Sequence, residues 1–257
     1  MTKNNDSVIL GENCQTGKNV ILKNVKIGNN CKIGDNVFLE SVSIGDNSVI
    51  ENNSIIGYST ISGHYYDQTT PKNYSANDSK YRIIIGNGVL LRTGVTIYMD
   101  VNIGNNCWIN HNAIIREQVS ISGDTTIGSN TICENNVSIG KRCVIHNNTM
   151  ICAETLLESF VFVGPGVSFT NNSPIGHLRD VPSTIRGAKL RLGCAIGGGA
   201  TICPGVEIGE ESIIGAGSVV TKNISSRIIV AGNPAQKIKD VEQSSLIKEE
   251  FRKKYGY

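Results

Sequence analysis

The sequence has little net charge, no long apolar run and no signal-peptide core, and each absence excludes a class of protein. Over 257 residues, 24 Lys and Arg nearly balance 22 Asp and Glu, which leaves a formal charge of +2. Without a basic surface we expect no nucleic-acid partner. No apolar run approaches the length of a membrane span, and the polar start MTKNNDSVIL lacks a signal-peptide core. We therefore expect a cytoplasmic protein that does not insert into a membrane.

A strict period of six dominates the middle of the chain. From Ile85 to Phe169 every sixth residue is apolar, and a small or β-branched residue follows four positions after nearly all of them. The apolar positions are Ile85, Leu91, Ile97, Ile103, Ile109, Ile115, Ile121, Ile127, Cys133, Ile139, Ile145, Ile151, Leu157, Val163 and Phe169. Helices repeat near 3.6 and strands near 2, so a short extended piece followed by a turn explains the period better.

The turn position of each unit carries residues that tolerate a left-handed backbone. These are Gly88, Gly94, Asp100, Asn106, Asn112, Asp124, Asn130, Asn136, Asn148 and Gly166. Three units close a triangular coil of about 18 residues, and coils stack by parallel pairing at roughly 4.8 Å. Only stacking buries the apolar positions, so the pattern predicts an all-β solenoid.

The cysteines fit this repeat better than a metal site. None of the eight forms a CxxC pair, so we expect no metal. Six fall on inward positions of the repeat and are predicted to fill the core: Cys14, Cys31, Cys107, Cys133, Cys143 and Cys194. Cys152 and Cys203 are predicted to point outward.

Two loops and a C-terminal extension interrupt the solenoid. The first coils repeat at 17 residues, through Leu10, Ile27, Ile44 and Ile61. Loops are predicted at 62–84, which holds four tyrosines, and at 171–188; long loops in a solenoid are usually functional or disordered, and the tyrosines favour function for the first. We expect a solenoid over 1–230 and an extension over 231–257 whose helix caps the open end.

The repeat resembles the hexapeptide-repeat family, whose members form left-handed parallel β-helices; here the resemblance implies about ten coils. Residues 196–238, which end in AGNPAQKI, are similar to the C-terminal coils of hexapeptide acyltransferases. The resemblance implies that acetyl-CoA or another acyl-CoA is a co-substrate and that its pantetheine arm lies along these coils. The small residues Gly198, Ala200, Ala216 and Ser218 and the pair Asn233–Pro234 would contact the arm. Lys222, Arg227 and Lys237 would meet the phosphates, or form a solvated basic end.

A second stretch narrows the resemblance. LLRTGVTIY followed by NCWINHNAIIRE resembles the N-acyltransferases that act on nucleotide-linked amino sugars in bacterial surface polysaccharide (lipopolysaccharide O-antigen) pathways. This implies a dTDP- or UDP-linked amino deoxysugar as acceptor. It also implies a homotrimer with active sites between neighbouring subunits.

Residues 18 apart should lie in columns along the solenoid. One column holds Tyr98, Arg116, Glu134 and Cys152, the next holds Met99, Glu117, Asn135 and Ala153, and a third holds Thr93, His111, Ser129 and Asn147. We expect Arg116 to pair with Glu134. Glu117 has no opposite charge in its own column and is the first candidate to contact the acceptor amine.

Amine acylation needs a group that takes a proton and a donor to the developing oxyanion. Glu117 and His111 are the candidate bases, since the ordinary pKa of histidine lies near working pH, and Asn135 and Asp100 complete the predicted catalytic set. Predicted substrate-binding residues are Arg82, Arg92, Tyr65, Tyr66, Arg116 and Glu134. Each candidate also has a purely structural explanation as a turn residue or a solvated charge.

Three other functions stay open. An O-acetyltransferase acting on a sugar or small alcohol is the nearest, and there His111 would be indispensable. Zinc carbonic anhydrases share this fold, but their third histidine position is here Ile151. A non-catalytic solenoid is disfavoured by the C-terminal coils.

Overall fold

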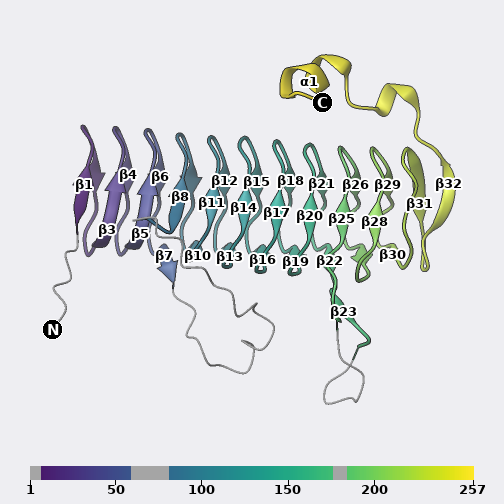
Figure 1. Cartoon of the computed structure of the whole chain (residues 1–257), viewed down its shortest axis with the longest axis horizontal. Helices are drawn as coiled ribbons and strands as arrows, with labels where there is room; N and C mark the ends of the chain where they lie inside the picture. Colours follow the sequence, from purple (N-terminus) through teal and green to yellow (C-terminus); the bar gives the residue numbers. More distant parts are fainter. Residues whose placement is uncertain (1–6, 59–80, 176–183) are drawn as a thin grey trace.

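The computed structural model describes residues 7–58, 81–175 and 184–257. It is a parallel β-solenoid of about 11 turns, matching a left-handed β-helix and ending in a single short helix. The coils stack into a straight rod, from β1 at one end to β31 and β32 at the other (Figure 1). The predicted fold class is confirmed.

Each coil contributes one short strand to each of three faces. Face one is formed by β1 (Val8–Leu10), β3 (Ile21–Ile27), β5 (Phe38–Ile44), β8 (Ile83–Ile85), β11 (Asn102–Ile103), β14 (Ser120–Ile121), β17 (Ser138–Ile139), β20 (Leu156–Leu157), β25 (Lys189–Leu190) and β28 (Glu207–Ile208). Face two is formed by the first residues of β3 and β5 and by β7 (Ile55–Tyr58), β10 (Thr96–Tyr98), β13 (Ile114–Ile115), β16 (Ile132–Cys133), β19 (Met150–Ile151), β22 (Ser168–Phe169), β27 (Thr201–Ile202) and β30 (Val219–Val220). Face three is formed by β2 (Gln15–Thr16), β4 (Lys32–Ile33), β6 (Val49–Ile50), β9 (Leu90–Leu91), β12 (Trp108–Ile109), β15 (Thr126–Ile127), β18 (Val144–Ile145), β21 (Phe162–Val163), β26 (Ala195–Ile196), β29 (Ile213–Ile214) and β31 (Ile228–Ala231).

The register follows the period of six. Ile97 pairs with Ile115, and Ile115 pairs with Cys133, so every large residue lies over the corresponding residue of the previous coil. Their side chains fill the centre of the rod with almost no exposure. The predicted turn residues all have positive φ, from 56° to 77°. Longer side chains occupy the same backbone conformation at Gln118, Arg142, Glu154, Phe160, Glu211 and Arg227.

Three corners join the faces. The loop corner, between faces two and one, contains Met99–Asp100 and Glu117–Gln118 and is where both interruptions leave the rod (Figure 1). The glycine corner, between faces three and two, contains Asn110–Asn112 and Gly197–Gly199. The tail corner, between faces one and three, contains Lys141–Arg142 and lies under the C-terminal helix.

The first interruption ends earlier than predicted. Strand β7 ends at Tyr58 and β8 begins at Ile83, so the predicted loop 62–84 overlaps the start of β8. Ile44 pairs with Ile85 across the interruption, and Ile61, the predicted next position of the 17-residue frame, lies outside the described residues. At the second interruption, β23 (Asn172–Ser173) and β24 (Thr184–Ile185) form an antiparallel pair.

The C-terminal helix does not cap the rod. Instead β32 (Gln236–Asp240) pairs antiparallel with β31 and covers the last coil. After the 3-10 turn η2 (Gln243–Ser245), helix α1 (Glu249–Tyr255) lies back along the side of the solenoid (Figure 1). The rings of Tyr255 and Tyr257 contact Phe160 at 5.5 and 5.7 Å between ring centroids. No helix in the described chain is long and apolar enough to cross a bilayer.

The cysteine predictions are mostly correct. All eight thiols are free, and Cys31, Cys107, Cys133, Cys143 and Cys194 are buried, whereas Cys14 near the open end is only partly buried. The prediction that Cys152 points outward is wrong. Its thiol is buried at the loop corner, where it donates a hydrogen bond to the Phe169 carbonyl at 2.9 Å.

Candidate functional site

An ion pair between a half-buried arginine and a buried glutamate lies at the middle of the loop corner. Glu117 is 2% exposed, and the Arg116 guanidinium binds its carboxylate in a fork, with N–O distances of 2.7 and 3.2 Å. The predicted pairing of Arg116 with Glu134 is therefore wrong. Glu134 instead accepts the backbone N–H of Ala153 at 2.9 Å, because its side chain reaches the turn of the next coil. A planar guanidinium meets a carboxylate best through two parallel bonds, and Glu117 offers that geometry within the same turn.

Aromatic rings border this ion pair. The Arg116 guanidinium lies 5.8 Å from the centre of the Tyr98 ring, and Tyr98 lies 4.9 Å from Tyr58. Burial raises the pKa of the Tyr98 hydroxyl, and the nearby Arg116 charge lowers it in part. Both tyrosines lie where the first interruption leaves the rod.

The other loop-corner candidates have structural partners of their own. Arg82 binds Asp100 through both nitrogens of its fork, with one N–O distance of 2.8 Å, which ties the end of the first interruption to the rod. Asn135 is half-buried, and its side chain forms no hydrogen bond to another residue of the described ranges. Tyr65 and Tyr66, predicted to bind substrate, lie outside the described residues.

At the glycine corner, Arg92 occupies the lone pair of His111. Arg92 binds Glu51 at 2.8 Å and donates from Nε to His111 Nε2 at 3.3 Å. The backbone N–H and hydroxyl of Thr93 also donate to Glu51, each at 3.1 Å. Because a guanidinium stays protonated, His111 Nε2 is the acceptor, and this arrangement does not leave that nitrogen free to take a proton.

His146 has the free imidazole of this corner. It is exposed, its ring packs on Phe162 at 5.2 Å, and its ring nitrogens bond to nothing in the part of the chain that the structure describes. His146 is not among the catalytic residues predicted from the sequence. Its distance of 18 residues from Gly164, the start of a glycine-rich stretch, is the signal that could have identified it.

That stretch is an open section of the glycine corner. A Cβ added at Gly166, Gly199 or Gly217 would meet nothing within 4 Å. In most earlier coils the corresponding position is an asparagine (Gly94 is the exception), and some of these asparagines bond to each other, as Asn130 does to Asn148 at 3.3 Å. At Gly166, Gly199 and Gly217 the backbone is therefore accessible to a ligand.

Unpaired backbone donors accompany the open glycines. In some earlier turns a side chain of the next coil accepts the outward N–H, as Asn147 Oδ1 accepts that of Ser129 at 2.8 Å, whereas the N–H groups of Asn52 and His111 also lack a partner among the residues described. The corresponding N–H groups of Asn147, Gly198 and Ala216 have no partner among the residues described, because Pro165 and Ala216 follow where an asparagine would stand. Backbone donors are strong hydrogen-bonding groups that a ligand can satisfy.

The predicted cofactor-binding residues divide into two groups. Gly198 and Ala216 lie on the open stretch, and Lys222, Asn233 and Pro234 are exposed near the same end. Ala200 and Ser218 face the core, and the Ser218 hydroxyl accepts the Gly232 N–H at 3.2 Å. Neither side chain therefore lies on the surface of the open stretch. Arg227 binds Glu211 at 3.2 Å and Lys237 binds Asp240 at 2.7 Å, so both cations have carboxylate partners.

The structure does not bring Glu117 and His111 together within one chain. Glu117 belongs to the loop corner and His111 to the glycine corner, and face two lies between them. No group of three His, Cys, Asp or Glu side chains within the described ranges could hold a metal ion.

Comparison with known proteins identifies the repeat. A sequence model of the bacterial transferase hexapeptide matches residues 7–41, 24–58 and 193–222, and one of the hexapeptide repeat of succinyl-transferase matches residues 118–153. A Saccharomyces cerevisiae protein named "Putative acetyltransferase" is 36% identical over 84 residues, covering 30% of this chain and 43% of that protein. A Staphylococcus aureus protein with the same description is 48% identical over 46 residues, covering 18% of this chain and 23% of that protein. The chain thus spans less than half the length of these relatives.

Two solved structures are similar at low identity. A variant of a Bacillus cereus N-acyltransferase, in complex with dTDP and coenzyme A, is 21% identical with a TM-score of 0.43, covering 63% of this chain and 84% of that chain. A variant of Caulobacter crescentus perosamine N-acetyltransferase, in complex with coenzyme A and GDP-perosamine, is 18% identical with a TM-score of 0.33, covering 75% of this chain and 57% of that chain. The segments 7–58, 118–153 and 193–222 therefore match hexapeptide repeats of bacterial transferases.

Proposed function

We propose that the protein is an acyltransferase that takes its acyl group from coenzyme A at the glycine corner. One observation carries the proposal: an open stretch of glycines with unpaired backbone donors ends at the free imidazole of His146. The curated relatives named above are described as acetyltransferases. The glycines would allow the backbone to approach the pantetheine arm, and the unpaired N–H groups would bond to its amide oxygens.

The proposed reaction assigns a separate task to each group. His146 takes the proton from the acceptor amine as the amine attacks the thioester carbonyl. An outward N–H of the same corner, that of Asn147, is placed to donate to the oxyanion that develops. The carbon–sulfur bond then breaks, and the leaving thiolate takes the proton from the protonated His146, so that amide and free coenzyme A result. His111, whose Nε2 accepts from Arg92, would bind rather than remove a proton.

The acceptor we propose is an amino deoxysugar linked to dTDP or UDP, which rests on the resemblance of the Leu90–Tyr98 and Asn106–Glu117 segments. Glu117 and Asn135 of the loop corner would contact it. Because these groups and His146 lie on different corners, one chain alone would not complete the site. A homotrimer would complete it, with the loop corner of one subunit facing the glycine corner of the next.

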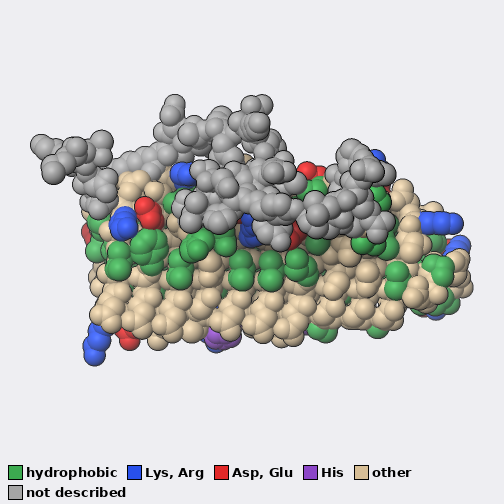
Figure 2. All heavy atoms as spheres, turned by 90° about the horizontal axis from the view of Figure 1, so that it is seen from below, with side chains coloured by type: hydrophobic (Ala, Val, Ile, Leu, Met, Phe, Trp, Pro, Cys, Tyr) green, Lys and Arg blue, Asp and Glu red, His purple; other side chains and the backbone are tan. Residues whose placement is uncertain are grey.

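Two apolar outer faces support the homotrimer. Face two carries Ile55, Ile114, Ile132 and Met150 outward, and hydrophobic side chains gather in a band along the rod (Figure 2). Face three carries Trp108, Val144 and Phe162, which are 55%, 38% and 40% exposed. Contiguous apolar surface of this kind marks a contact with another protein. The two faces meet at the glycine corner, so a trimer that covers them places this corner beside a neighbouring subunit.

Steady-state kinetics with acetyl-CoA and a panel of dTDP- and UDP-linked amino sugars tests the proposal. We expect release of free coenzyme A and a product heavier by one acetyl group, stable to mild base as an amide is. A base-labile product formed from a hydroxyl sugar would instead identify the O-acetyltransferase. Absence of coenzyme A release with every acceptor, together with no binding of coenzyme A, would contradict the proposed class.

A further inference from the structure

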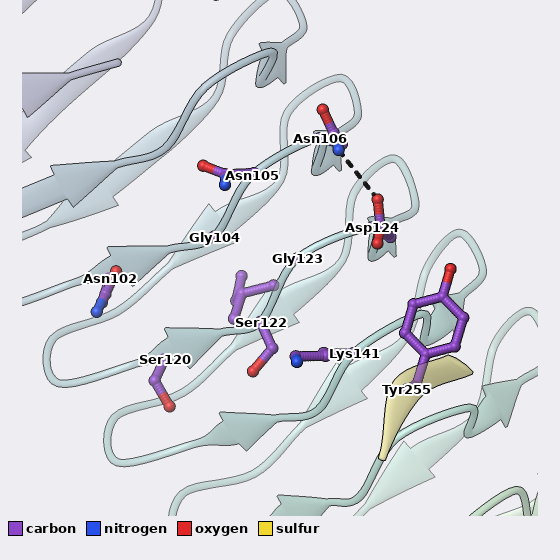
Figure 3. Close-up of a pocket in the computed structure, with 11 residues that line it drawn as sticks. Asn102, Gly104, Asn105, Asn106, Ser120, Ser122, Gly123, Asp124, Lys141 and Tyr255 are labelled. Carbon is purple, nitrogen blue, oxygen red and sulfur yellow. Dashed lines mark hydrogen bonds between the residues drawn. The ribbon is translucent and has the colours of Figure 1, made fainter. Parts of the chain in front are cut away.

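A polar hollow of about 500 Å³ lies on face one and the tail corner, away from the glycine corner where the two apolar faces meet (Figure 3). Its floor is face one, where Asn102 and Ser120 point outward from β11 and β14. Its side is the tail corner, with Asn105, Ser122 and Lys141, and Tyr255 of α1 closes one end (Figure 3). A volume of this size lies within the range of about 300–1,000 Å³ for small-molecule sites.

The lining offers both donors and acceptors. The side-chain oxygen of Asn105 already accepts the Asn87 N–H at 2.8 Å, so the side-chain nitrogen of Asn105 remains as a donor. Ser120 and Ser122 contribute hydroxyls, which donate and accept, and Asn102 contributes both kinds of group. Such an array matches the hydroxyl groups of a ligand, because each hydroxyl also donates and accepts.

The charge of the hollow disfavours a phosphate ligand. Lys141 is its one cation in the lining, and it lies in the same hollow as the Asp124 carboxylate, which accepts a bond from Asn106 at 3.1 Å. Within the lining these two opposite charges balance, and the nearest further cations, Arg142 and Lys254, lie against the Tyr255 ring rather than in the lining. A neutral polyhydroxyl ligand fits this balance.

Tyr255 gives the hollow one rigid aromatic wall. Its hydroxyl accepts a hydrogen bond from Arg142, the Arg142 guanidinium lies 5.0 Å from its ring centre, and Phe160 packs edge-on at 5.5 Å. Farther back along the tail, Arg252 binds the buried Glu211 at 2.9 Å, and Glu211 also accepts the Ile247 N–H at 2.7 Å. These contacts fix α1, and so the ring stands in a set place.

We propose that this hollow binds a saccharide, with the hydroxyl edge of a pyranose on the Asn and Ser side chains and its apolar face on Tyr255. Hydroxyls on one edge and C–H groups on one face are what distinguish a pyranose from other neutral ligands of this size. The site is separate from the glycine corner. It needs neither acyl-CoA nor turnover, so it stands or fails independently of the proposed function.

Ligand-observed saturation-transfer NMR with maltotriose and with triacetylchitotriose tests the site on the full chain. We expect transfer to at least one trisaccharide with the native protein and with Tyr255→Phe, which keeps the ring. We expect at least a tenfold loss of affinity in Tyr255→Ala and in Ser122→Trp, which fills the hollow. Ser43→Trp, on face one but outside the hollow, is the matched control and should bind as the native protein does.

Several outcomes would overturn the proposal. One is the absence of transfer to either trisaccharide from the native protein. Another is equal binding by Ser122→Trp and Ser43→Trp, which would place the saccharide elsewhere. A third is binding of UDP alone to the native protein that is lost in Ser122→Trp, which would show that a nucleotide occupies this hollow. A change in the oligomeric state of Ser122→Trp, measured by light scattering, would make the hollow a contact between copies.

Discussion

At the scale of single residues, two histidines on one corner are predicted to differ in function. His146 has free ring nitrogens beside the open glycines, whereas His111 accepts a hydrogen bond from Arg92. If His146 is the general base, His146→Ala should lower kcat by about 10²–10⁴-fold with little change in stability. His111→Ala, the matched control, should reduce kcat by less than tenfold. Equal losses in both variants would refute this assignment.

Measurements of folding stability can separate the structural role of the Arg116–Glu117 ion pair from any role of Glu117 in catalysis. Because Glu117 is 2% exposed and bound by both arms of Arg116, Glu117→Gln should lower the free energy of unfolding by about 1–3 kcal/mol. A double-mutant cycle with Arg116→Gln, followed by urea unfolding, measures the coupling of the pair. If Glu117 also contacts the acceptor, KM for the amino sugar rises beyond what the folded fraction explains; an unchanged KM would leave it a structural residue.

Thiol reactivity follows from burial. Burial raises the pKa of Cys107 to about 11 and of Cys133, Cys143 and Cys152 to about 12. A raised pKa keeps a thiol protonated, and the thiolate is the reactive form. At pH 8 an alkylating reagent should therefore label only Cys14 and Cys203 in the folded protein, and all eight thiols in denaturant. Peptide mass spectrometry reads the sites, and rapid native labelling of Cys152 would contradict its position.

At the scale of the turn, the sequence identifies most corners but not their exceptions. Gly, Asn and Asp mark positions such as Asn130 because they tolerate the left-handed backbone. Arg142, Phe160 and Glu211 adopt the same backbone, and each of them contacts the C-terminal tail. These residues are determined by their contacts with the C-terminal tail, which lies about 40 to 110 residues further along the chain. Local backbone propensity therefore could not predict them.

Gln118 has this backbone strain without contacting the tail. Its φ of 61° suits asparagine better, and a left-handed non-glycine residue costs of order 1–3 kcal/mol. Gln118→Asn should therefore raise the free energy of unfolding by up to about 1 kcal/mol, measured by urea denaturation. The reverse control, Asn130→Gln, should lower it by a similar amount and also lose the bond to Asn148. A stabilised Gln118→Asn variant with impaired turnover would indicate that Gln118 serves the acceptor site. Destabilisation by Gln118→Asn would contradict the strain argument.

At the scale of the whole molecule, the period of six predicts the stack, and side-chain reach decides the rest. The repeat places Ile97, Ile115 and Cys133 in one inward column, as the register confirms. It could not tell whether Arg116 would pair along its column or within its own turn, because both carboxylates lie one side-chain length away. Nor could it foresee that the tail folds back along the rod, since that direction depends on Glu211 and Phe160 meeting Arg252 and Tyr255.

The apolar outer faces lead to the last prediction, which concerns assembly. Ile132 lies outward on face two, and a charge placed there would be desolvated in any contact between subunits. Ile132→Asp should weaken assembly by more than about 2 kcal/mol, or roughly 30-fold in the dissociation constant. Light scattering should give the native protein three times the 27.6 kDa chain mass and the variant a lower value. Ser138→Asp, outward on the polar face one, should stay trimeric.

Because the proposed site needs loop and glycine corners from different subunits, Ile132→Asp should also lose turnover while its unfolding midpoint, extrapolated to high dilution, stays unchanged. A native protein that is monomeric yet active would show that one chain suffices.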